Sequence, residues 1–208
     1  WTIAPKDATF FGKNTKIFPA CLNLKEYQSK QIYLRHVRSI IFSGNLNYYP
    51  NVDAILFFYE IFEEIKKSYP EVNFSIAGNG WNSQLDKLKS DSSVIFLGEV
   101  EDMNHTLMQA DMAVCPMSLA SGMQTKVIEA MVAGVPSVIS LKAKGGLNLI
   151  SKTHCMIANN ETEFLQHVLT LMDNHDLRKK LAKNARSYIE SHHSLVNLSK
   201  GIFDAYEI

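Results

Sequence analysis

Short apolar runs alternate with longer amphipathic segments along most of the chain. From residue 39 onward, runs of four to six mostly apolar residues recur, and most are followed by glycine or proline. Such runs are typical of strands buried on both faces of a parallel sheet. The pattern predicts strands over 39–43, 72–77, 94–97, 112–115, 137–140 and 155–158, and one over 16–19 in an otherwise irregular start.

Between these runs, apolar residues recur three and four positions apart, which indicates helices with one buried face. The clearest helix opens at Pro50, a residue favoured in the first turn. The pattern predicts helices over 50–68, 83–89, 102–109, 123–133, 162–172, 176–192 and 195–206, with a glycine-containing loop over 144–147. The basic residues of the 176–192 helix are expected on a solvated face: Arg178, Lys179, Lys180, Lys183 and Arg186.

Strands and helices that alternate at this spacing require parallel strands joined by right-handed crossovers. The sequence therefore predicts an α/β, doubly wound, mostly parallel sheet of the Rossmann-like type, with helices on both faces and a helical C-terminus. Ligands of such sheets bind outside the carboxyl ends of the strands. We therefore expect the turns at Gly44, Gly78, Gly98 and Pro116 to line one functional edge.

Composition narrows the function classes. The chain has 208 residues, of which 46% are hydrophobic and 20% charged, so a disordered chain is excluded. Twenty-one basic residues balance twenty-one acidic ones, which argues against nucleic-acid binding. No uncharged apolar run reaches the ~20 residues of a membrane helix. Three cysteines without paired spacing (Cys21, Cys115 and Cys155) indicate reduced thiols in a cytoplasmic protein, and neither they nor the histidines form a metal signature.

The segment 118–140 carries the candidate chemistry. A loop of small residues at Ser121 and Gly122 runs into a helix, whose free N–H groups and dipole suit a diphosphate. Lys126 and Glu129 are three positions apart and share one helix face. The lysine could neutralise a phosphate, and the glutamate could accept hydrogen bonds from ribose hydroxyls. The alternative from spacing alone is an ordinary exposed ion pair.

The stretch Thr-Lys-Val-Ile-Glu-Ala-Met-Val-Ala-Gly-Val-Pro-Ser-Val, residues 125–138, resembles the signature of family 4 retaining glycosyltransferases. These enzymes have two Rossmann-like halves, the GT-B architecture, and the signature lies in the C-terminal half that binds the nucleotide-sugar. Residues 40–54 resemble the first strand, loop and helix of that half. Residues 96–100 resemble its third strand, 177–188 its C-terminal helix, and 16–24 the segment that leaves the N-terminal half.

The resemblance implies roles for individual residues. Glu129 corresponds to the acid that holds the donor ribose, whereas the first acid of the signature falls on Ser121. Gly122 and Lys126 fit a Gly-x-x-x-Lys variant of the family. The basic pair that the family places after the first strand is absent from residues 45–50, which leaves Lys126 and backbone amides to hold the diphosphate. The expected donor-binding residues are Gly44, Asn45, Gly98, Val100, Ser121, Gly122, Met123, Gln124, Thr125, Lys126 and Glu129.

The resemblance also implies a division of the chain. We expect residues 1–38 to belong to the crossover between the halves and residues 39–208 to form the nucleotide-sugar-binding domain. The N-terminal acceptor domain, with several catalytic groups, would then lie outside the chain, so no catalytic residue is assigned. We expect a nucleotide-diphosphate sugar as donor, a glycan or lipid-linked acceptor, and neither cofactor nor metal. The expected location is cytoplasmic, including the surface of a membrane.

Two other functions remain open at this point. A GT-B sugar-nucleotide epimerase would share the diphosphate site and act without an acceptor. A non-catalytic Rossmann-like binding module is suggested by the missing positive charge after Gly44 and by Ser121. A response-regulator domain is less favoured because no acidic cluster follows the strands. Tyr48 and Tyr49 are candidates for contacts with a donor or partner, and Trp81 could either stack on a base or cover a helix end.

Overall fold

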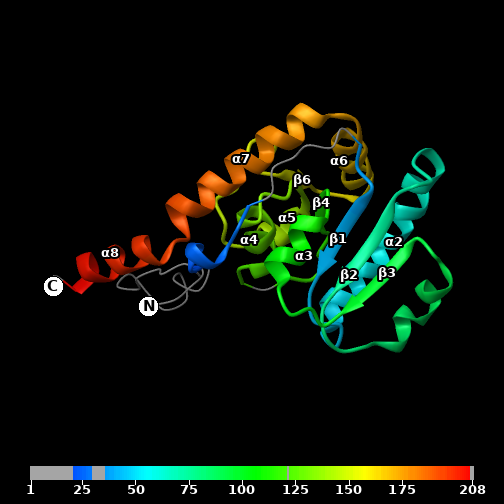
Figure 1. Ribbon diagram of the computed structural model, residues 1–208, viewed down its shortest axis with the longest axis horizontal. Helices are drawn as coiled ribbons and strands as arrows, with labels where there is room; N and C mark the ends of the chain where they lie inside the picture. Colours follow the sequence, from blue (N-terminus) through cyan, green and yellow to red (C-terminus); the bar gives the residue numbers. More distant parts are fainter. Residues whose placement is uncertain (1–20, 30–35, 121, 207–208) are drawn as a thin grey trace.

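The computed structural model describes residues 21–29, 36–120 and 122–206. The described strands form one parallel six-stranded sheet in the order β3-β2-β1-β4-β5-β6, which confirms the predicted fold class (Figure 1). The strand predicted over 16–19 lies outside the described residues. The strands are β1 (Ser39–Ser43), β2 (Asn73–Ala77), β3 (Val94–Gly98), β4 (Met112–Cys115), β5 (Ser137–Ser140) and β6 (Met156–Ala158).

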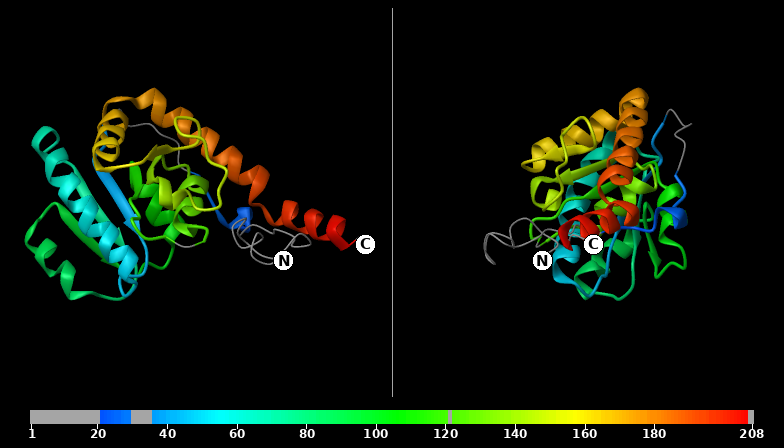
Figure 2. Two further views of the ribbon diagram at one scale, coloured as in Figure 1. Left: turned by 180° about the vertical axis from the view of Figure 1, so that it is seen from behind. Right: turned by 90° about the vertical axis from the view of Figure 1, so that its left-hand side faces the viewer.

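Helices cover both faces of the sheet (Figures 1 and 2). Helices α2 and α6 pack together on one face, α3 and α4 pack together on the other, and α7 contacts both α4 and α6. Helix α8 extends away from the body of the domain. The helices are α2 (Tyr49–Ser68), α3 (Met103–Gln109), α4 (Thr125–Val132), α5 (Leu141–Lys144), α6 (Glu161–Asp173), α7 (His175–His192), α8 (Leu195–Tyr206) and the 3₁₀ helices η1 (Leu24–Glu26) and η2 (Ser83–Ser90). None of them, within the described ranges, combines the length and apolar character that crossing a membrane requires.

Two predictions about the helices were wrong in detail, and one short helix was not predicted. The segment predicted as a helix over 83–89 forms a 3₁₀ helix, because its only buried apolar residues, Leu85 and Leu88, are three apart and align in that geometry. The helix predicted from residue 123 begins two residues later. A short helix, α5, was not predicted, and the Ser140 hydroxyl caps it by accepting a hydrogen bond from the Ala143 N–H.

An aromatic cluster between α2, α6 and the sheet forms the larger core. Phe58 packs against Phe74 of β2 with ring centroids 4.8 Å apart, and against Phe164 of α6 at 6.0 Å. All three side chains are buried. This cluster packs the middle of α2 against β2 and α6.

Arg178 corrects the expected solvated face of α7. Its side chain is 1% exposed, and its guanidinium donates to the carbonyl groups of Leu171 and Met172 in the last turn of α6. The last carbonyl groups of a helix lack partners within the helix, and a cation there is favourable. Arg178 is therefore a buried cap for α6.

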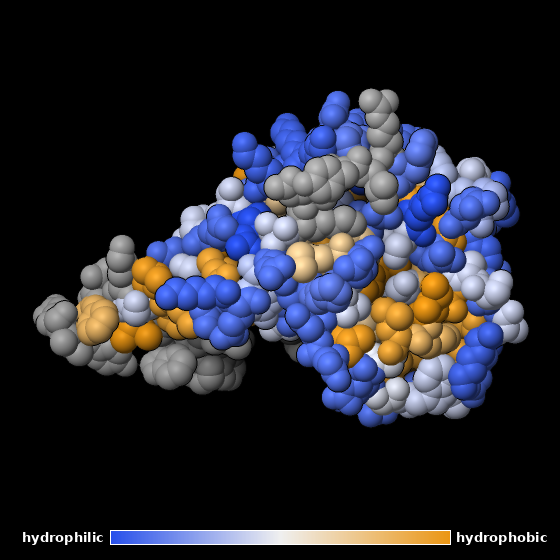
Figure 3. Space-filling model, in the orientation of Figure 1, coloured by the Kyte–Doolittle hydropathy of each residue, from blue (hydrophilic) through white to orange (hydrophobic). Residues whose placement is uncertain are grey.

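The edge strand β3 leaves part of the sheet uncovered. Because η2 connects β2 to β3 in place of a long helix, Ile95 and Leu97 are 40% and 41% exposed. Figure 3 shows the resulting apolar patch over β3, on the face opposite α2. The main core therefore lies under α2 and α6.

The loops after β1, β2 and β3 are in close backbone contact. The Gly44 N–H donates to the Ala77 carbonyl at 2.9 Å, and the Gly78 N–H donates to the Gly98 carbonyl at 2.8 Å. A Cβ atom at Gly78 would lie 1.9 Å from the Gly44 carbonyl oxygen. The first two loops can therefore lie side by side only when residue 78 is glycine.

We expect Gly78→Ala to lower the free energy of unfolding by about 3 kcal/mol or more, because the Gly44 carbonyl would have to move. Gly98→Ala is the matched control, since its φ is +67° with no heavy atom within 4 Å of the added Cβ. The control should cost only about 1–2 kcal/mol for its left-handed backbone. Urea unfolding of both variants measures the difference, and equal losses would contradict the close-contact explanation.

Candidate functional site

A pocket of about 270 Å³ opens at the carboxyl ends of β1, β2 and β3. Its walls come from the loops after these strands and from the first turns of α3 and α4. The strand order reverses between β1 and β4, where doubly wound sheets bind their ligands. The described residues that line it are Ser43, Gly44, Asn45, Gly78, Asn79, Glu99, Val100, Met103, Thr125, Lys126 and Glu129.

Lys126 brings a positive charge from α4 to the first loop. Its Nζ lies 4.6 Å from the ring centroid of Phe42 and 3.8 Å from the Met117 sulfur. A Cβ atom at Gly44 would lie 3.0 Å from the same Nζ. Burial lowers the pKa of this ammonium, although Cys115 and Glu129 oppose that shift. The loop after β1 has no basic residue of its own, so Lys126 of α4 supplies the positive charge beside it.

Asn51 holds this ammonium in place. Its Oδ1 accepts a short hydrogen bond from Lys126 Nζ, and its Nδ2 donates to the Asn45 carbonyl at 2.9 Å. The side chain is buried in the first turn of α2. The sequence analysis missed Asn51, but a signal was present: Asn51 continues the buried stripe of Ile55 and Phe58, where a polar residue is unexpected.

Asparagines also tie the first two loops together. Asn45 Oδ1 accepts a hydrogen bond from the Asn47 N–H at 2.8 Å, and Asn47 Oδ1 accepts one from the Trp81 N–H at 3.2 Å. The Leu46 N–H donates to the Asn79 carbonyl at 2.8 Å. These local bonds explain why polar but uncharged residues occupy the loop.

Glu129 lies one helical turn after Lys126 in α4 and lines the same pocket. Burial raises the pKa of its carboxyl, and the attraction of Lys126 opposes this. Helix α4 starts without a side-chain cap at Gln124, and the exposed Thr125 also lines the pocket. The site therefore combines a fixed cation, an uncapped helix N-terminus and a half-buried carboxylate.

The structure gathers only part of the predicted set around the pocket. Six of the predicted residues line it: Gly44, Asn45, Val100, Thr125, Lys126 and Glu129. Gly98, Gly122, Met123 and Gln124 are not among its lining residues, and Ser121 lies outside the described residues. Sequence reasoning did not select four other lining residues, although each lies at or next to a predicted strand end or helix start: Ser43, Asn79, Glu99 and Met103.

The aromatic candidates lie outside the pocket lining. Trp81 packs edge-on against Phe96, with centroids 5.0 Å apart, and Lys89 Nζ lies 3.9 Å from its ring centroid. Tyr48 and Tyr49 are about half exposed. Over the described ranges, no three His, Cys, Asp or Glu side chains are grouped closely enough to hold a metal ion.

A comparison with known protein families shows which family the chain belongs to. Residues 37–174, two thirds of its length, match the family model described as glycosyl transferases group 1. The chain belongs to this family. It is also similar to an uncharacterized 44.6 kDa protein in the cps region of Klebsiella pneumoniae, 23% identical over 177 residues that cover 81% of this chain and 46% of that protein.

Several solved structures share the fold of this group 1 domain. The crystal structure of TarM matches 100% of this chain and 43% of its own, with a TM-score of 0.81 at 15% identity. Anabaena HepE, solved in complex with UDP, matches 92% of this chain and 57% of its own, with a TM-score of 0.74 at 14% identity. The C-terminal domain of LpcC from Francisella tularensis, a group 1 family protein, matches 84% of this chain and 99% of its own, with a TM-score of 0.68 at 16% identity.

These matches define the architecture and the extent of the chain. The sheet and its helices have the Rossmann-like fold of these structures, among them the C-terminal domain of LpcC, which belongs to a group 1 glycosyl transferase protein. The chain spans about half the length of its relative from Klebsiella and of the TarM and HepE chains. The resemblance of residues 125–138 to a glycosyltransferase signature is confirmed at the level of the group 1 family.

The Glu129→Gln variant tests whether burial of the charged Glu129 carboxylate lowers the free energy of unfolding. Because burial raises the folded-state pKa above its ordinary 4.5, the carboxyl favours folding only when protonated, and this contribution is lost as the pH rises through the folded-state pKa. The stability of the variant relative to wild type should therefore increase between about pH 4 and pH 7, by less than about 1 kcal/mol. Urea unfolding at both pH values measures the change, and a decrease in the relative stability of the variant over this range would mean that the attraction of Lys126 outweighs burial.

Proposed function

We propose that this domain binds the donor of a retaining, family 4 glycosyltransferase that transfers a sugar from a nucleotide-diphosphate sugar to a glycan or lipid-linked acceptor. The carrying observation is that Lys126 and Glu129, one turn apart on α4, line one pocket together with the glycine loops after β1 and β2. A cation and a carboxylate at this spacing suit a diphosphate and the hydroxyl groups of its ribose.

The chemistry follows from the leaving group. When the sugar is transferred, negative charge develops on the diphosphate, and a fixed positive group stabilises that charge without reorganising. Lys126 is already held by Asn51 and Phe42. The backbone N–H groups at the start of α4 add a partial positive charge. Glu129 accepts hydrogen bonds from the ribose, and the backbone near Gly98 and Val100 faces the nucleobase.

The relatives support a nucleotide-sugar as donor. HepE has been solved with UDP, with UDP and glucose, and with UDP-glucose. In a protein of about twice this length, a second domain would form the other wall of the cleft, and we propose that the acceptor binds to that domain. A cleft positions two substrates only when both of its walls are present. The isolated domain therefore binds nucleotide without transferring sugar, in a cytoplasmic protein that uses no metal.

Calorimetric titration with UDP, GDP and ADP tests this function. We expect one nucleotide to bind with a Kd on the order of 10 μM to 1 mM. Lys126→Ala and Glu129→Ala should each weaken binding at least ~10-fold, because each removes a hydrogen bond to a charged group. Lys87→Ala and Glu60→Ala, at exposed positions of η2 and α2, are the matched controls and should bind like wild type.

Two outcomes would count against the proposal. If no nucleotide binds, or if binding survives both Lys126→Ala and Glu129→Ala, the pocket is not a donor site and a non-catalytic binding module is favoured. Sugar transfer by the isolated domain would contradict the assignment of the acceptor to a second half. In a full-length protein, an acceptor-dependent release of nucleoside diphosphate separates transfer from epimerisation.

A further inference from the structure

Residues 22–28, which we call the strap, run along the domain from the end of α7 to α3 (Figure 1). The strap begins next to the end of α7, where the Leu22 N–H donates to the His193 carbonyl at 2.9 Å and Leu22 forms an isolated parallel bridge with Ser194. It then forms η1 and ends beside α3. The strap is therefore held at both ends by long-range contacts.

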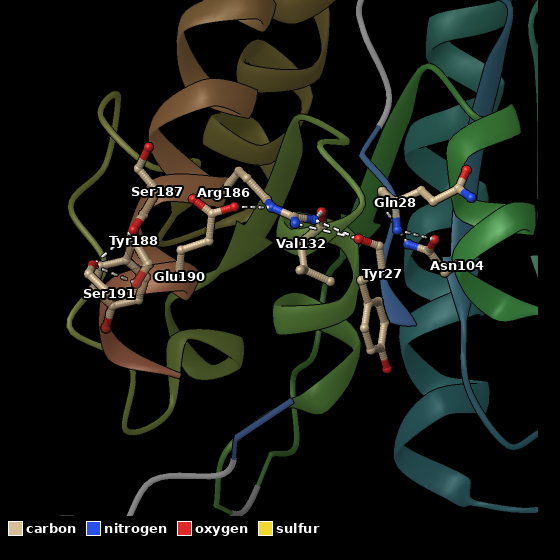
Figure 4. Close-up of polar contacts among 9 residues, drawn as sticks. All are labelled: Tyr27, Gln28, Asn104, Val132, Arg186, Ser187, Tyr188, Glu190 and Ser191. Carbon is tan, nitrogen blue, oxygen red and sulfur yellow. Dashed lines mark hydrogen bonds and ion pairs between the residues drawn. The ribbon is translucent and has the colours of Figure 1, made fainter. Parts of the chain in front are cut away.

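Asn104 attaches the strap to α3. Its Oδ1 accepts a hydrogen bond from the Gln28 N–H at 3.0 Å, and its Nδ2 donates to the Gln28 carbonyl at 3.1 Å (Figure 4). The Asn104 side chain is buried, whereas Gln28 is exposed, so both bonds are partly buried. Its neighbour Met103 lines the donor pocket. The strap is thereby tied to one wall of that pocket.

Arg186 attaches the strap to α4. From α7, its guanidinium donates to the carbonyl of Val132, the last residue of α4, and both terminal nitrogens lie 3.4 Å from the Tyr27 carbonyl oxygen (Figure 4). Its Nε donates to Glu190 at 2.6 Å, which fixes the guanidinium plane. Like Arg178, this arginine caps a helix, but the helix is the one that carries Lys126 and Glu129.

Tyr27 brings the strap close to the site. Its ring packs against the main core. Burial is the largest cause that raises the pKa of its phenol, and the negative charges of three nearby carboxyl groups raise it further: Glu129, Glu26 and Asp102. Two of these carboxyls flank the pocket: Glu129 lines it, and Asp102 caps α3. The strap is therefore linked through Arg186 to the C-terminal end of α4 and through Asn104 to the first turn of α3.

We infer that Arg186 is a positioning residue of the donor site: through Val132 and Tyr27 it fixes α4 against the strap, and Asn104 fixes the strap against α3. This inference rests on the proposed function. The two helices contribute different residues to the pocket, Met103 from α3 and Lys126 with Glu129 from α4. Because coupling is reciprocal, bound nucleotide should also stabilise the strap.

Nucleotide titration of Arg186→Ala and Arg186→Lys, combined with amide hydrogen exchange, tests the inference. Arg186→Ala should raise the Kd for the nucleotide that wild type binds at least ~5-fold. Arg186→Lys keeps a cation near Val132 but cannot bond two carbonyl groups in the same way, so its Kd should be intermediate. Lys183→Ala, which removes an exposed cation one turn away on α7, is the matched control and should leave the Kd unchanged.

Exchange at the Gln28 amide separates positioning from general stability. In wild type, saturating nucleotide should slow this exchange. In Arg186→Ala, nucleotide should no longer slow it. Both proteins are compared at a temperature at which near-UV circular dichroism shows that they are folded. If Arg186→Ala does not fold, Arg186→Lys and Asn104→Ala, which cuts the strap from α3, must show the raised Kd. Wild-type affinity in these variants overturns the inference alone, whereas a wild type that binds no nucleotide overturns the proposed function with it.

Discussion

The site depends on a part-buried ammonium that the fold must keep partnered. Lys126 extends from α4 under the loop after β1, where Asn51 accepts its hydrogen bond and Phe42 faces its charge. A buried cation without such partners would cost several kcal/mol or lose its proton. Its partners come from α2 and β1 and the lysine itself from α4, so this one charge fixes the three elements relative to one another. Gly44 belongs to the same arrangement, because a Cβ there would lie 2.7 Å from Asn51 Nδ2.

This arrangement accounts for the loop chemistry. Basic residues in the loop after β1 would repel Lys126. The loop carries asparagines in their place, and these form local hydrogen bonds. The cation is thus already placed before any ligand binds, which is the requirement for electrostatic stabilisation of a leaving group. At the same pocket, partial burial of Glu129 disfavours its charged form and raises the pKa of its carboxyl. Buried charges that are unfavourable for folding are typical of functional sites.

Much of this could be predicted from the sequence. Periodicity placed all six described strands within a residue or so, because parallel strands buried on both faces are uniformly apolar. The position of Lys126 and Glu129 on one helix face followed from their spacing. The direction of the Lys126 side chain did not, since it depends on Asn51, 75 residues away in sequence. For the same reason, the roles of Arg178 and Arg186 as helix caps were missed: a basic residue on an amphipathic helix looks solvated until the neighbouring helix end is known.

The most direct test of the central claim is an amide NMR map of where nucleotide binds. The account predicts that UDP, GDP or ADP shifts the amide signals of Gly44, Gly78, Val100, Thr125 and Glu129, at the carboxyl edge of the sheet. A second, larger pocket of about 560 Å³ lies at the opposite edge, lined in part by His36, Tyr69 and His175. Shifts confined to that second pocket, or the absence of shifts with all three nucleotides, would contradict the assignment of the donor site.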